Sequence, residues 1–134
     1  MASVAAAKKV GSGFGNDKEI VRVIYDFSAD GGAVGTLTLA TATSDCVISD
    51  FMMVVKTACT SGGSATVSAG LTGDVDAFKV AEAVAGLTAA TVWPEDGAFA
   101  GKIKLASGQV LTMSIATAAL TAGKIEFSFE VMKI

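Results

Sequence analysis

The feature that most restricts the fold is a strict alternation of apolar and polar residues near the end of the chain. The odd-numbered positions of this segment carry large apolar side chains, namely Ile125, Phe127, Phe129 and Val131. The positions between and after them carry Glu126, Ser128, Glu130 and Met132. Successive side chains of a β-strand point to opposite faces of a sheet, so this period of two predicts a strand at 125–131 with one face in a core.

Seven further strand-like segments precede this one and are separated by turns rich in glycine and small polar residues. Together they predict eight strands, at 20–27, 34–41, 46–58, 65–70, 76–80, 102–105, 111–115 and 125–131. The third strand is apolar almost throughout, which favours burial on both faces, with a kink near Ser49 and Asp50. Segment 81–90 stays undecided, because its apolar residues have near-helical spacing but Gly86 weakens so short a helix.

Eight short strands joined by turns predict an all-β fold, either a two-sheet sandwich or a barrel. The strand count favours an eight-stranded antiparallel sandwich of the jelly-roll type over an immunoglobulin-like sandwich. A length of 134 residues suits a single domain. Residues 1–19 have neither strand nor helix periodicity. The expected organisation is therefore an extended N-terminal arm at 1–19 and a β-sandwich domain at 20–134.

Low charge limits the partners that such a domain can have. Only 17% of the residues are charged and the net charge is −3, so there is no basic field to attract nucleic acid. A free monomer normally keeps a well-charged surface to remain soluble. These features favour a permanent assembly whose interfaces cover much of the surface, with a moderately acidic, solvated monomer as the alternative. The longest uncharged stretch, 105–123, is too polar to span a membrane.

Catalytic chemistry has little support in the sequence. The chain contains no histidine, which removes histidine-based nucleophilic, zinc and acid–base sites. Segment 74–76 resembles a fragment of a calcium loop but suits a solvated turn, and Glu95 and Asp96 suit an exposed turn better than a glycosidase pair. Cys46 and Cys59 match no metal or redox motif, so we expect buried free thiols rather than a disulfide. We therefore expect no enzyme, no metal site and no cofactor.

Four residues are candidates for contacts with a partner. Lys8 and Lys9 could touch nucleic acid or an acidic protein surface, although two lysines are equally compatible with simple solvation. Phe14 lies in segment 11–16, which suits an arm better than a phosphate loop because Asn stands where the last glycine should be. Trp93 is the only tryptophan. It is either an anchor in the core or in an interface, or a platform on which a sugar stacks.

Three stretches of the chain resemble a known family. Segment 57–71 has an apolar strand, a Thr-Ser-Gly-Gly-Ser-Ala-Thr turn and a strand that ends in glycine. Segment 118–125, Ala-Ala-Leu-Thr-Ala-Gly-Lys-Ile, leads into the alternating strand, and Tyr-Asp-Phe at 25–27 precedes Asp-Gly-Gly-Ala-Val-Gly-Thr at 30–36. With these motifs, most of 21–131 resembles the jelly-roll head decoration, or cement, proteins of tailed bacteriophages.

The resemblance implies a function as well as a fold. Proteins of this family form trimers on the outside of an icosahedral capsid and clamp neighbouring major capsid subunits. It implies a structural virion protein, made in the cytoplasm of the host bacterium, that binds the outer capsid surface as a homotrimer and stabilises the shell. Its partner would be the major capsid protein, without nucleic acid or membrane. The resemblance does not extend to the N-terminal segment, for which our own hypothesis is that the arm, with Phe14 as an apolar anchor, docks onto the capsid or an adjacent copy. The alternative is a carbohydrate-binding sandwich module of a phage tail or fibre, with Trp93 in its site.

Overall fold

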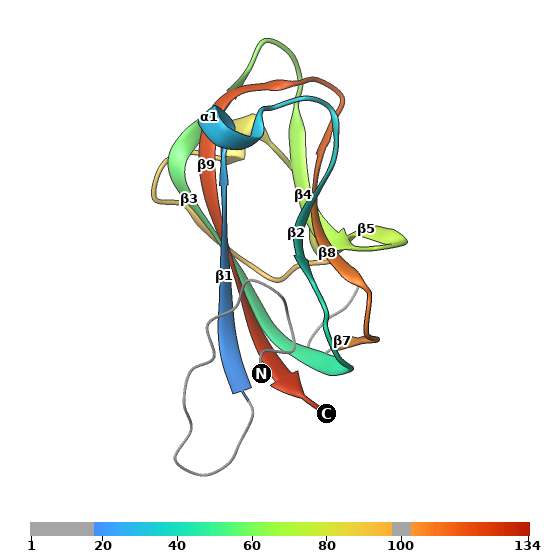
Figure 1. The fold of residues 1–134 in the computed structure, drawn as a ribbon. Coiled ribbons are helices and arrows are strands. Elements are labelled where there is room, and N and C mark those ends of the chain that lie inside the picture. Colours follow the sequence, from blue (N-terminus) through green and yellow to red (C-terminus); the bar gives the residue numbers. More distant parts are fainter. Residues whose placement is uncertain (1–17, 98–102) are drawn as a thin grey trace.

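The structure is a computed structural model that describes residues 18–97 and 103–134. These residues form two antiparallel sheets that face each other (Figure 1). The five-stranded sheet contains β1 (Lys18–Asp26), β9 (Leu120–Lys133), β3 (Cys46–Ser61), β6 (Val92–Pro94) and β7 (Ile103–Leu105). The four-stranded sheet contains β2 (Gly35–Thr41), β8 (Val110–Ala116), β4 (Thr66–Leu71) and β5 (Asp74–Ala83). Two short helical segments complete the described part, α1 (Phe27–Asp30) and the 3-10 helix η1 (Val84–Gly86).

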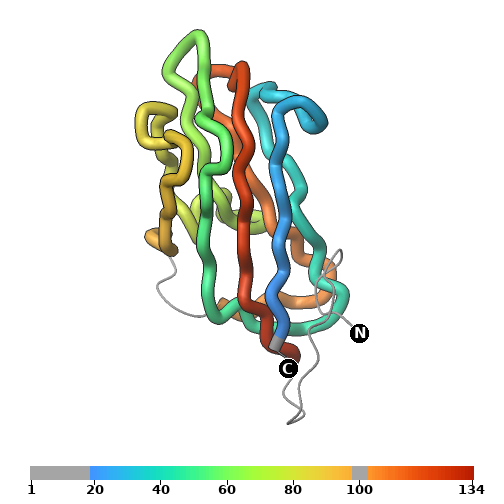
Figure 2. Tube along the Cα trace, turned by 90° about the vertical axis from the view of Figure 1, so that its left-hand side faces the viewer, coloured from blue at the N-terminus to red at the C-terminus, as the bar shows by residue number. Residues whose placement is uncertain are grey.

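The strand pairing is nested, with early strands bonded to late ones. β1 pairs with β9, β2 with β8, β3 with β6 and β7, and β4 with β5. Taken together, these pairs form one long hairpin whose closed end is the β4–β5 pair. When this hairpin is rolled up, β9 lies beside β3 and β8 lies beside β4, which gives the orders β1-β9-β3-β6 and β2-β8-β4-β5. Figure 2 shows β3, β9 and β1 side by side in the first of these sheets. Two sheets connected in this way form a jelly roll, so the predicted fold class is confirmed.

The ninth strand arises because one position of the jelly roll is occupied by two short strands. Residues of β6 lie opposite Met52–Val54, and residues of β7 lie opposite Cys46–Ile48. The sequence predicted β7 but no strand at the residues of β6, which directly precede the turn expected at Glu95 and Asp96. β6 lies at the end of the sheet order, where the proline removes no ladder hydrogen bond that a further strand would need.

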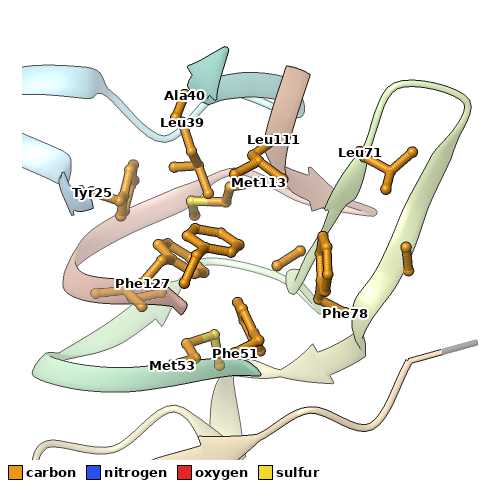
Figure 3. Close-up of a cluster of buried hydrophobic side chains, with 14 of the residues drawn as sticks. Tyr25, Leu39, Ala40, Phe51, Met53, Leu71, Phe78, Leu111, Met113 and Phe127 are labelled. Carbon is orange, nitrogen blue, oxygen red and sulfur yellow. The ribbon is translucent and has the colours of Figure 1, made fainter. Parts of the chain in front are cut away.

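Aromatic side chains of both sheets fill the space between them (Figure 3). Phe51 of β3 and Phe129 of β9 have ring centroids 5.3 Å apart, and Phe78 of β5 lies 5.6 Å from Phe51 and 5.7 Å from Phe129. All three are buried. Each buried phenylalanine contributes roughly 1.5–3 kcal/mol by leaving water. The apolar residues of the alternating pattern in β9, such as Phe129, are therefore the ones that face the core, as the sequence predicted.

Two details differ from the sequence-based expectation. β3 is not buried on both faces, because none of the described helices and strands packs on the outer face of its sheet and Met52 is 41% exposed. The irregularity expected near Ser49 is present as a shift in the β3–β9 register between Ile48 and Asp50. The undecided segment 81–90 contains the end of β5 and the single turn η1, and no α-helix.

Candidate interaction surfaces

The predicted contact residues fall into two groups. Lys8, Lys9 and Phe14 lie outside the described residues, together with segment 11–16 and most of the arm expected at 1–19. Trp93 lies in β6, at the side of the sandwich where the five-stranded sheet faces β5. Trp93 is therefore the one predicted site residue whose surroundings can be examined in atomic terms.

Trp93 is held from two directions. Its indole Nε1 donates a hydrogen bond to the backbone oxygen of Gly86 at 3.2 Å. The ammonium group of Lys79 lies 4.7 Å from the ring centroid, within the range of a cation–π interaction. The half-buried ring also packs against the hydrophobic core. A sugar ring would have to displace Lys79 to use that face of the indole, so the contacts are those of an anchor within the fold.

Lys79 is the residue that sequence reasoning missed. Its side chain is 0% exposed, and the ammonium donates to the Asp96 carboxylate and to the Val80 backbone oxygen, both at 3.0 Å. A third contact, to the Glu82 carboxylate, measures 3.4 Å. Because an ammonium has three donors, these contacts use its full hydrogen-bonding capacity. The only signal in the sequence is a single lysine inside the apolar stretch 77–80.

Asp96 completes a clasp between the two sheets, which we define as Lys79, Trp93 and Asp96. The Asp96 carboxylate also accepts a hydrogen bond from the Val80 backbone N–H at 2.9 Å. The backbone N–H of Asp96 donates to the Phe78 carbonyl at 3.0 Å. The clasp thus ties β5, the edge of one sheet, to the residues that follow β6, the edge of the other. Asp96 is exposed, as the sequence predicted, but its carboxylate is engaged in contacts with β5.

The other acidic pair lies at the start of β5. The pKa of the Asp76 carboxyl is raised, chiefly because its side chain shares a hydrogen bond with Asp74. The two residues belong to a strand and not to the solvated turn that the sequence predicted. Within residues 18–97 and 103–134, no group of three or more histidine, cysteine, aspartate or glutamate side chains could hold a metal ion.

The two cysteines are buried and free, as predicted. Burial raises the pKa of the Cys59 thiol to about 11, and burial together with nearby acids raises the pKa of Cys46. Since the thiolate is the reactive form, both groups are poor nucleophiles at neutral pH. They serve as small apolar side chains of the core.

The outer faces of the two sheets differ in chemistry. β2, β4 and β8 contain no charged residue. Short hydroxyl side chains occupy the outer face of these strands, and Thr36 and Ser114 are joined by a 3.1 Å hydrogen bond across the β2–β8 pair. Over these three strands, another protein could contact the exposed part of the face, at Thr36 and Thr38, without stripping water from ions, which is a costly step in forming an interface; the charged residues of this sheet lie on β5.

The outer face of the five-stranded sheet combines charge with exposed apolar side chains. Glu126 of β9 forms ion pairs with Arg22 at 3.5 Å and with Lys56 at 3.3 Å. Beside them, Ile20 and Ile24 of β1 are exposed, as is Met52 of β3. Large apolar side chains among polar ones are typical of surfaces that bind other proteins.

Among the helices that the structure describes, none is long and apolar enough to cross a membrane.

Comparison with known proteins shows similarity in fold only. No family model matches the chain, and no curated protein matches it. Three solved structures contain a chain of similar fold. The capsid of Ralstonia phage GP4 gives a TM-score of 0.68 at 13% identity, over 97% of this chain and 93% of that chain. The cyanophage Pam1 capsid asymmetric unit gives 0.66 at 15%, over 97% and 94%. The acidic stable capsid of Helicobacter pylori bacteriophage KHP30 gives 0.64 at 14%, over 93% and 91%.

Proposed function

We propose that the chain is a structural virion protein that binds the outer surface of a phage capsid as a homotrimer and stabilises the shell. The observation that carries the proposal is the nested jelly roll, similar to chains in three phage capsid structures. In each case the similarity covers more than 90% of both chains. A match over nearly the whole of both chains indicates that the partners share one domain architecture and not merely a common motif.

The chemistry of the side chains supports a binding role over a catalytic one. The chain has no histidine. Lys79 and Asp96 are joined in the clasp, and both cysteine thiols have raised pKa values. What the surface offers instead is one sheet face that is uncharged over β2, β4 and β8, and one sheet face with exposed isoleucines and a methionine. Surfaces of this kind suit a subunit that is covered by neighbours on a lattice.

In this proposal the arm at 1–19 contributes to docking, with Phe14 as an apolar anchor and Lys8 and Lys9 as cationic contacts. Three copies of each weak contact act together in a trimer, so the overall affinity far exceeds that of one arm. A protein that binds the assembled shell and not its separated subunits stabilises the shell by mass action. No catalytic step is needed.

The test is co-sedimentation of the purified protein with capsids from which it has been stripped, followed by heating of both samples. We expect saturable binding at a multiple of three copies per capsid facet and a higher disruption temperature for the decorated capsids. A protein of similar size and charge, added in place of this one, controls for nonspecific binding. Absence of saturable binding would remove the capsid surface as the docking site, and an unchanged disruption temperature would remove the stabilising role.

A further inference from the structure

The two long sides of the sandwich are closed to different degrees. On one side, the clasp joins β5 to the residues after β6 through the Lys79–Asp96 ion pair at 3.0 Å. On the other side, β1 and β2 are the edges of their sheets, and neither pairs with a further strand among residues 18–97 and 103–134. Figure 1 shows these two edges facing each other across the open side. The open side therefore has free backbone groups on both of its edges.

A hollow of about 170 Å³ lies between the β1 and β2 edges. Its lining is mixed: Val23 and Tyr25 of β1 and Leu37 and Leu39 of β2 supply apolar surface, and Thr38 and Asp30 supply polar surface. The Tyr25 hydroxyl already donates a 2.6 Å hydrogen bond to the Gly31 carbonyl, so this polar group needs no further acceptor. A cavity of about 150 Å³ is large enough to bind benzene, so the hollow has room for one aromatic ring.

In the half beside the hollow, the β1 edge has no bulge, no proline and no buried charge, the features that normally protect a free edge from other chains. Its pairing with β9 runs from Lys18 to Asp26 without a register shift, and the strand contains no proline. Natural proteins usually interrupt such edges with bulges, prolines or charges that point inward. Glu19, near the start of β1, is the one buried charge on the strand, and the half beside the hollow carries Val23 and Tyr25.

Phe14 suits this hollow by its chemistry and by its place in the chain. It is the only aromatic residue before β1, and Gly13 and Gly15 on either side of it leave room for close approach of the backbone. The four residues from Phe14 to Lys18 reach at most about 14 Å. From Lys18 to Ile24, six residues of strand extend about 20 Å. Even with the length of its side chain, Phe14 could approach the hollow of its own chain only if the arm reversed at Lys18 and ran back fully extended, whereas Phe14 of another copy has no such constraint.

We propose that the Phe14 ring of one copy occupies the hollow between β1 and β2 of a neighbouring copy. This inference rests on the proposed function only for the association of copies, and it requires no particular capsid. The inserted ring would contact Val23 and Leu37, which are only half-buried in the isolated domain. Burial of one aromatic anchor in a pocket commonly dominates the energy of a small interface.

Cross-linking between two singly substituted chains tests the contact. Ser12→Cys places a thiol two residues from Phe14 and leaves the ring intact, and Thr38→Cys places one on an exposed position that lines the hollow. Mixing the two variants and adding a short bis-maleimide should give a covalent heterodimer. Because each chain has one introduced thiol, this product can form only between copies. The native thiols are buried and control for background in the unsubstituted protein.

Two matched controls define the specificity. Ala85→Cys is exposed on η1, away from the β1 and β2 edges, and should yield little heterodimer with the Ser12→Cys chain. Adding Phe14→Ala to the Ser12→Cys chain should lower the yield with Thr38→Cys about tenfold or more, because the anchor is lost. Three outcomes would each overturn the inference: equal heterodimer yields with the cysteines at positions 38 and 85, a yield that Phe14→Ala leaves unchanged, or no heterodimer at all.

Capsid binding by the same proteins separates this inference from the proposed function. If the unsubstituted protein sediments with capsids but the heterodimer does not form, the hollow is not the docking site of Phe14 and the proposed function stands. If the heterodimer forms with the expected specificity but no capsid binding is seen, the proposed function fails and the contact between copies stands. Carrying out the cross-linking in solution and on decorated capsids covers both states.

Discussion

Lys79 is a residue whose burial must be compensated, because an unpaired ammonium in an apolar interior is strongly unfavourable. Its contacts with Asp96 and Val80 supply that compensation, and the Trp93 ring adds a cation–π interaction. Asp96 itself is 39% exposed, so water can solvate its carboxylate when the lysine is absent. The energetic role of Lys79 is therefore to join two sheet edges and not to neutralise a buried acid.

We expect Lys79→Met to lower the free energy of unfolding by about 2 kcal/mol, because charge-assisted hydrogen bonds are lost while the apolar stem is kept. Urea denaturation measures the change. A double-mutant cycle with Asp96→Asn isolates the coupling between the two side chains, which should be about 1 kcal/mol or more. Additive effects of the two substitutions would show that the ion pair does not hold the clasp together.

The buried thiol of Cys59 predicts a loss of stability at alkaline pH. Its pKa is raised from 9.0 to about 11, so the unfolded chain releases this proton at a lower pH than the folded protein does. The stabilising contribution is fully present below pH 9 and is lost as the pH rises toward about 11. We expect the free energy of unfolding to fall across this window.

Cys59→Ala is the comparison that isolates the thiol. It should reduce the slope of stability against pH between about 9 and 10, a range in which Tyr25, with its pKa raised to about 12 by burial, still contributes little. Equilibrium urea titrations at several pH values measure both slopes. Identical slopes for the two proteins would contradict the assignment of the alkaline loss to Cys59.

At the scale of the elements, β4 and the first residues of β5 approach so closely that one glycine is required. A Cβ atom at Gly70 would overlap the carbonyl oxygen of Asp74 and the backbone of Val75. We expect Gly70→Ala to lower the free energy of unfolding by roughly 1–3 kcal/mol, because the backbone of the hairpin must move. Thermal or urea denaturation measures the loss.

Gly62, in the turn between β3 and β4, provides the matched control. A Cβ atom there meets nothing within 4 Å, and its backbone conformation is open to any residue. Gly62→Ala should leave stability unchanged or raise it by about 0.4–1 kcal/mol, because it restricts the unfolded chain. Equal losses at both positions would indicate that flexibility of the chain, and not the contact with β5, sets the requirement at Gly70.

The sequence predicted the elements wherever one face of a strand is buried and the other is not. The alternation of β9 and the turn after β3 place the strands correctly, because the period of two reports directly on a half-buried sheet. The pattern fails at β6, which has only three residues, Val92–Pro94, and is too short to show a period. It also misjudged the outer face of β3, since apolar residues such as Met52 remain exposed there.

The candidate sites were less predictable than the strands. Lys79 and Asp96 are 17 residues apart, and their contact exists only because rolling up the sheets brings β5 next to the segment after β6. Likewise, the hollow joins Val23 to Leu37 through the packing of two sheet edges and not through a local motif. The residue type of Trp93 marked it as either an anchor or a sugar platform, but nothing in the sequence identified Lys79 as its partner.

At the scale of the whole molecule, the described core and the arm have separable tasks. Among the described residues, the buried hydrophobic side chains lie between Val21 and Val131 and form the core of the sandwich. In the proposed assembly, the outer surface of this sandwich and the arm would contact other copies and the capsid. The two outer faces, one uncharged over β2, β4 and β8 and one with exposed isoleucines, would provide two different surfaces for neighbours in the proposed assembly.

Deletion of residues 1–17 therefore should separate binding from folding. The truncated chain begins at Lys18, the first residue of β1, and keeps the full pairing of β1 with β9. We expect its urea midpoint to match that of the full chain, while co-sedimentation with stripped capsids weakens at least about a hundredfold, since a trimer would lose three docking arms together. A Phe14→Ala variant of the full chain should fall between the two. Unchanged capsid affinity in the truncated chain would show that the sheet faces alone carry the binding, and a lowered urea midpoint would show that the arm belongs to the fold.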